Sequence, residues 1–167
     1  MDAGLLVGRA VLGLLMAAHG AQKLFGWFGG YGLTAVSGFF ESLGFRPGRF
    51  FALAASTAEL AGGLLVAAGL LGPIGPALIV SVMIVAAVTV HWGAGVIGEK
   101  SMELPILYGA GAATLALTGP GRYSIDALLG LNTIWTPQIA WIALAIGILG
   151  GIVNLTLRRT VPHAATA

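Results

Sequence analysis

The chain has 167 residues, of which 57% are hydrophobic and only 8% are charged. A soluble domain carries about 25% charged residues, so this composition excludes a water-exposed globular surface and predicts an integral membrane protein of one domain. The formal charge of +2 is too small to suggest nucleic acid as a partner. The absence of cysteine excludes disulfides, cysteine-ligated iron–sulfur clusters and covalently attached c-type haem.

Five apolar segments approach the length of about 20 residues that a helix needs to cross a bilayer. The first lacks the basic leader and cleavage site of a signal peptide, so we expect it to remain as a membrane helix. A turn rich in glycine and proline, residues 72–76, joins the second and third segments into an antiparallel hairpin. Thr136 followed by Pro137 marks the start of the last segment. The predicted spans are residues 4–22, 50–71, 74–92, 101–118 and 137–157.

A shorter helical pattern lies between the first two spans. Val36, Phe39, Phe40 and Leu43 recur at helical spacing within residues 34–43. This spacing predicts a short amphipathic helix that lies at the membrane interface. An ordered loop is an equal alternative for this segment.

These elements predict an all-α, polytopic membrane helix bundle. We expect residues 1–130 to form a four-helix membrane core, residues 131–157 to add a fifth transmembrane helix, and residues 158–167 to form a short disordered tail. The positive-inside rule places the N-terminus outside and the C-terminus in the cytoplasm. The basic residues on the predicted cytoplasmic side are Lys23, Arg46, Arg49, Lys100, Arg158 and Arg159.

Glu59 lies in the middle of the second span, where a carboxylate costs about 2.5–3.5 kcal/mol by insertion scales. From the rise of a helix, Glu59 lies about 13 Å and Arg9 about 20 Å from the same interface. An arginine side chain can bridge that difference. We therefore predict a polar cavity among the first four spans, in which Glu59 faces Arg9 or His19. The other candidates lie toward that interface and are Lys23, His91 and Glu103.

Each candidate also has a purely structural interpretation. Arg9 and Glu59 could form an ion pair that only fixes helix register. His19 could bond a backbone carbonyl, His91 could face water, and Glu103 could complement a helix dipole. Two histidines on separate helices indicate no metal site. Their similar depth is the only support for a bis-histidine haem, so we do not expect haem.

Three segments carry a family resemblance. The first span contains RAVLGLLMAAHGAQK, the second contains Glu59 followed by LAGG, and the fourth is followed by GPGRYSID at residues 119–126. Over about residues 5–130 this combination resembles the DoxX family of small bacterial membrane proteins. The resemblance implies a compact four-helix bundle in the inner membrane of a bacterial cell. It also implies a relation to the quinone-reducing membrane subunit of thiosulfate:quinone oxidoreductase and to redox homeostasis. The fifth apolar segment lies beyond the usual family core.

The GPGRYSID segment also has a direct physical interpretation. Its glycines and Pro120 predict a tight turn after the fourth span. Arg122 and Asp126 are spaced so that their side chains could pair. We favour a structural turn for this segment.

Three functions stay open at this point. The first is a quinone-linked oxidoreductase subunit that receives electrons from a separate donor, because the chain has no recognisable flavin, haem or cluster motif. The second is a non-catalytic assembly subunit that contacts the lipid bilayer and other membrane or soluble redox subunits, or copies of itself. The third is a small transporter or proton conduit, although no inverted repeat supports it. In the first function, the residues for proton delivery are Glu59, His19 and His91, and those that bind the quinone are Arg9, Lys23 and Glu103.

Overall fold

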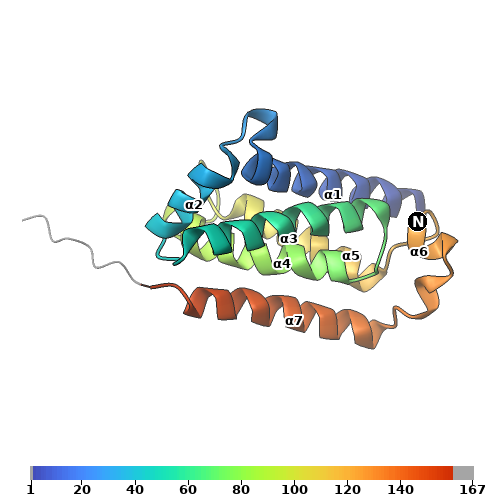
Figure 1. Ribbon diagram of the computed structural model, residues 1–167. Helices are drawn as coiled ribbons and strands as arrows, with labels where there is room; N and C mark the ends of the chain where they lie inside the picture. Colours follow the sequence, from blue (N-terminus) through green and yellow to red (C-terminus); the bar gives the residue numbers. More distant parts are fainter. Residues whose placement is uncertain (1, 160–167) are drawn as a thin grey trace, which may run out of the picture.

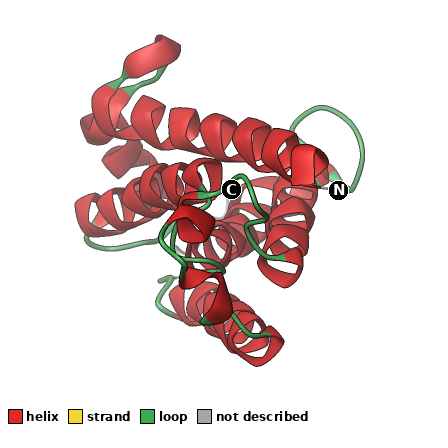
Figure 2. Ribbon diagram, turned by 90° about the vertical axis from the view of Figure 1, so that its right-hand side faces the viewer, coloured by secondary structure: helices red, strands yellow, loops and turns green. Residues whose placement is uncertain are grey.

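The computed structural model describes residues 2–159, and throughout this range the chain forms helices, turns and loops without a strand (Figures 1 and 2). Within this range, four helices are long and apolar enough to cross a membrane. They are α1 (Asp2–Phe25), α3 (Gly48–Ala68), the segment Ile74–Ala94 that begins with α4 (Ile74–Ala86), and α7 (Pro137–Thr156). The prediction of an all-α, multi-pass membrane protein is confirmed. Residues 160–167 of the predicted tail lie outside the described residues.

Three shorter helices complete the described chain. They are α2 (Gly32–Ser42), α5 (Glu103–Thr118) and α6 (Ile125–Leu128). The segment 34–43 is helical, so the alternative of an ordered loop is wrong. The predicted span 101–118 forms α5, whose 16 residues fall short of the length of the other apolar helices. Short turns of 3-10 helix connect these elements at Trp27–Gly29, Trp92–Ala94 and Leu131–Thr133.

Glycine residues bring the backbones of α1 and α3 into contact. A Cβ atom added at Gly20 would lie 2.4 Å from the backbone nitrogen of Leu60. One added at Gly63 would lie 2.4 Å from a backbone nitrogen of α1. Small residues at such contacts let two membrane helices approach closely. The contact sets the register of the antiparallel pair and brings Lys23, about one turn after Gly20, beside Glu59.

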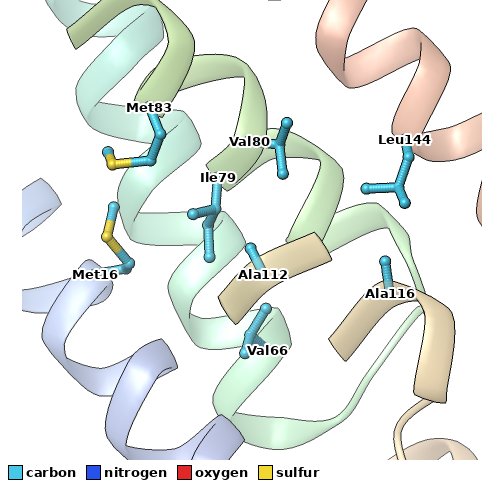
Figure 3. Close-up of a cluster of buried hydrophobic side chains, with 8 residues drawn as sticks. All are labelled: Met16, Val66, Ile79, Val80, Met83, Ala112, Ala116 and Leu144. Carbon is cyan, nitrogen blue, oxygen red and sulfur yellow. The ribbon is translucent and has the colours of Figure 1, made fainter. Parts of the chain in front are cut away.

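The last long helix, α7, packs against α4 (Figure 1). Cβ atoms added at Gly147 and Gly151 would lie 2.5 Å from the Ala77 carbonyl oxygen and 2.9 Å from that of Ser81. These two glycines therefore serve packing inside the chain. The buried core joins side chains of α1, α3, α4, α5 and α7 (Figure 3): Met16, Val66, Ile79, Val80, Met83, Ala112, Ala116 and Leu144.

Candidate functional site

An ion pair connects the last turn of α1 to α3. Lys23 Nζ donates to Glu59 Oε1 at a distance of 2.5 Å. The Glu59 side chain is 1% exposed, whereas that of Lys23 is 34% exposed. A partner of opposite charge offsets much of the cost of burying a carboxylate. The second carboxylate oxygen, Oε2, is buried and accepts no hydrogen bond from the described residues.

The ion pair borders a cavity of about 790 Å³. Ligand sites in proteins have volumes of about 300–1,000 Å³ and are lined mainly by apolar side chains with a few polar groups. This cavity fits that description, because most of the residues that line it are apolar, and the majority of those come from α2, α3 and α4. Asn154 of α7 and Ser81 and Thr89 of the α4 segment add polar groups to the lining.

One part of the cavity wall departs from α-helical geometry. The helix that begins with α4 changes to a π-helical turn at Ala87–His91. Thr89 and Val90 of this turn line the cavity, and Thr89 Oγ1 donates to the Val85 carbonyl oxygen at 2.8 Å. Turns of π-helix inside α-helices occur frequently at functional sites.

Arg9 is not the partner of Glu59, so the predicted Arg9–Glu59 pair is wrong. The glycine contacts place Gly20 beside Leu60, which leaves Arg9 about 16 Å away along the helix axis. Arg9 is 3% exposed and donates from Nη2 to the Tyr123 carbonyl oxygen. The sequence-based depths went wrong because the ends of the two helices are not level.

The end of the bundle that holds Arg9 also contains a second buried carboxylate, Asp126. Asp126 is 0% exposed. Its Oδ1 accepts from the Leu71 nitrogen at 3.0 Å and its Oδ2 from the Gly72 nitrogen at 2.7 Å. These bonds hold the turn between α3 and α4, in which Leu71 adopts a left-handed φ of 59°. The suggested pairing of Asp126 with Arg122 does not form, because Asp126 points to this turn and Arg122 is exposed.

The structural interpretation of GPGRYSID thus agrees with the structure. Ser124 begins α6 and accepts from the Ala127 nitrogen, as an N-cap residue does. The Asp126 nitrogen donates to the Gly69 carbonyl oxygen at 3.0 Å. Beside Arg9 only about 10 Å³ of space is left. This end of the bundle is filled by the chain itself.

Three other predicted site residues lie away from the cavity lining. His19 is exposed and contacts the ring of Tyr108 edge to face, with ring centroids 5.9 Å apart. His91 Nδ1 lies 2.7 Å from the Lys100 carbonyl oxygen. Glu103 is exposed in the first turn of α5. The predicted cluster therefore reduces to the Lys23–Glu59 pair, with Lys23 in the place where we expected Arg9 or His19.

The sequence reasoning missed the polar residues on the far wall of the cavity. Asn154 is a polar residue within the apolar run 137–157, and that contrast could have singled it out. Asn154 Nδ2 donates to the Gly150 carbonyl oxygen at 2.9 Å. Ser81 and Thr89 gave no such signal, because short hydroxyl residues are common in membrane helices. Among residues 2–159, no three histidine or acidic side chains lie close enough to hold a metal ion.

One comparison with known proteins supports the resemblance that the first two motif segments carry. The comparisons with curated proteins and with solved structures find no match. A model of the DoxX family matches residues 4–92, which is more than half of the chain. This range covers α1 to α4, and so includes Lys23, Glu59 and most of the cavity lining. The chain therefore belongs to the DoxX family.

Proposed function

We propose that the cavity binds a quinone and that the Lys23–Glu59 pair holds its head group. The observation that carries this proposal is an ion pair at the edge of an apolar cavity of about 790 Å³, in which one buried carboxylate oxygen has no partner in the part of the chain that the structure describes. A quinone has an apolar body and polar carbonyl oxygens, and it dissolves in the bilayer. Such a molecule matches both the apolar walls and the polar point of this cavity.

The two charged residues have separate tasks at the head group. The Lys23 ammonium donates a hydrogen bond to a quinone carbonyl oxygen, as cationic donors do at oxygen atoms that gain negative charge. Glu59 Oε2 lies free to exchange a proton with the same head group. We give Arg9, His19 and the other predicted residues no role there, because none of them lines the cavity.

Reduction of a quinone to a quinol takes two electrons and two protons. In this proposal Glu59 carries protons, and the electrons come from a separate reductant or a partner redox subunit. The protein is then the quinone-binding membrane subunit of an oxidoreductase, as the family resemblance implies. A protein with an assembly role alone would have no need of an apolar cavity that contains an ion pair.

Quantifying bound quinone after purification in mild detergent tests this function. We expect quinone in the organic extract of the wild-type protein. The extracts of Glu59→Gln and Lys23→Met should contain at least about tenfold less quinone, because each substitution removes one of the two polar contacts. Glu103→Gln is the matched control, since it neutralises an exposed carboxylate outside the cavity. A wild-type protein without quinone, even after addition of a short-chain quinone, would rule the function out.

The same preparations distinguish the other two functions. Stable co-purification of a partner subunit with both the wild type and the pair variants would favour the assembly function. Uptake of a solute or of protons into proteoliposomes that depends on Glu59 would favour the transporter or conduit function. We expect neither of these two results from a preparation that lacks bound quinone.

We further propose that α5, the predicted span 101–118, also crosses the membrane, which gives five spans with α7 as the last, and that α2 lies at the membrane interface. A helix of 16 residues is about 24 Å long, which can cross most of the apolar core, and α5 packs along α4. On this topology residues 1–130 form the membrane core, α7 is an addition, and the cytoplasm of a bacterial cell holds the C-terminus. The chain has no cysteine, so single-cysteine labelling is straightforward. Glu99→Cys and Arg122→Cys should react with a reagent added on opposite sides of the membrane. Labelling of both from the same side would show that α5 does not cross the membrane.

A further inference from the structure

Four arginines, from two segments far apart in the sequence, lie at one end of the bundle. Arg46 and Arg49 flank the start of α3, and Arg158 and Arg159 follow the end of α7. We call these four residues the basic cluster. We propose that the basic cluster binds the headgroup of an anionic phospholipid. This inference is independent of whether a quinone occupies the cavity.

Hydrogen bonds tie the two segments of the cluster together. The Arg159 nitrogen donates to the Gly44 carbonyl oxygen at 2.8 Å. Arg158 Nε donates to the Leu43 carbonyl oxygen at 2.5 Å. A Cβ atom added at Gly44 would lie 2.1 Å from the Arg159 carbonyl oxygen, so the two segments are in close contact. The end of α7 is thereby fixed beside the loop that leads into α3 (Figure 1).

The cluster presents positive charge with little negative charge to offset it. All four arginines are exposed. The acidic residue in this region, Glu41, accepts a hydrogen bond from the Gly48 nitrogen at 3.3 Å. Guanidinium groups bind phosphate with paired hydrogen bonds, and the anion relieves the repulsion between neighbouring cations.

The position of the cluster favours a lipid over a soluble anion. α3 and α7 are both candidate membrane spans, so the ends that carry the arginines lie where lipid phosphates are concentrated. Apolar side chains for the acyl chains lie next to the arginines. Phe50 at the start of α3 is 63% exposed, and Val153 and Leu157 at the end of α7 are each 54% exposed. When the headgroup of a phospholipid binds the basic cluster, its acyl chains can pack against this apolar surface.

Lipid titration of the purified, delipidated full-length protein, followed by native mass spectrometry, tests the inference. The probes are phosphatidylglycerol and phosphatidylcholine with identical acyl chains. We expect the wild type to bind phosphatidylglycerol more tightly, and the double variant Arg46→Gln/Arg49→Gln to bind it about 25-fold more weakly, about fivefold for each arginine. Arg158 stays unchanged, because its side chain holds the loop.

Matched variants separate a site from a general charge effect. Lys100→Gln/Arg122→Gln removes the same charge elsewhere on the protein and should keep the wild-type preference. Arg46→Lys/Arg49→Lys keeps the charge and should bind more tightly than the glutamine variant, and the melting temperature of each variant checks its fold. Equal binding of the two lipids, an equal loss in the Lys100→Gln/Arg122→Gln variant, or full displacement by inorganic phosphate at the lipid concentration would each overturn the inference.

Discussion

Charged side chains are buried at both ends of the α1–α3 pair, but their hydrogen bonding and the space around them differ. At one end Glu59 bonds Lys23 through Oε1, has no partner for Oε2 among residues 2–159, and borders a cavity of about 790 Å³. At the other end Asp126 uses both oxygens to bind backbone N–H groups, and the space beside Arg9 is about 10 Å³. A buried charge thus becomes a candidate binding group where an open volume and an unpartnered atom occur together. Where the chain fills the volume, the same kind of residue holds the fold.

Removal of the Asp126 carboxylate should have the largest effect on stability. Asp126→Ala leaves two backbone N–H groups of the α3–α4 turn without acceptors, which we expect to cost about 3–5 kcal/mol. Unfolding by dodecyl sulfate in mixed micelles measures this change. Asp2→Ala is the control, because Asp2 accepts a longer and exposed bond of 3.3 Å. If both variants lose the same stability, the turn does not depend on Asp126.

The Lys23–Glu59 pair should respond in a different way. Lys23→Met leaves the buried Glu59 without a counter-charge, which we expect to cost about 2–3 kcal/mol, since Lys23 is partly exposed. The double variant Lys23→Met/Glu59→Leu removes both charges and should return to within about 1 kcal/mol of the wild type. The same micelle unfolding assay measures both variants.

Binding must then be measured on the double variant. We expect it to be stable and yet to bind no quinone, which would separate the function of this pair from the structure it supports. If the double variant instead lost the sum of the stability that the two substitutions cost separately, Lys23 and Glu59 would be as essential to the fold as Asp126.

The glycine contact between the two ends should show an intermediate sensitivity. Gly63→Ala adds a Cβ atom 2.4 Å from a backbone nitrogen of α1, so the helices must separate, at an expected cost of about 2 kcal/mol. Gly8→Ala is the matched control on α1, where nothing lies within 4 Å of the added atom. Equal melting temperatures for the two variants would mean that α1 and α3 are not held in close contact.

The smallest effect is expected at Arg122. Its side chain is exposed and Asp126 is bound elsewhere, so Arg122→Gln should change stability by less than about 0.5 kcal/mol. The micelle unfolding assay again applies. A loss comparable to that of Asp126→Ala would restore the pairing that the spacing of the two residues suggested.

Helix positions could be predicted from the sequence because the length and the hydropathy of a segment depend on that segment alone. The predicted span 50–71 corresponds to α3 at Gly48–Ala68, and the span 137–157 to α7 at Pro137–Thr156. A bilayer of fixed thickness leaves little freedom in such boundaries. The prediction of Pro137 in the first turn after a Thr136 cap is confirmed for the same reason, since capping is local.

The partners of the buried charges could not be predicted, because they depend on how one helix slides along another. The distances of Arg9 and Glu59 from the interface were consistent with more than one pairing, and only the contact of Gly20 with Leu60 selects one. The bond from the Leu71 nitrogen to Asp126 joins residues 55 positions apart. No local pattern reports such a contact.

The π-helical turn at Ala87–His91 makes the cavity wall adjustable in steps of one residue. A π turn contains one residue more than the α turn it replaces, so deletion of Val88 would restore regular α-helical winding at this turn while the residues after it keep their faces. The change would be local to Thr89 and Val90, which lie in this turn and line the cavity. Relatives with one residue fewer at this turn would have cavities of different shape, so single insertions and deletions here are a route by which ligand preference can change without loss of the bundle.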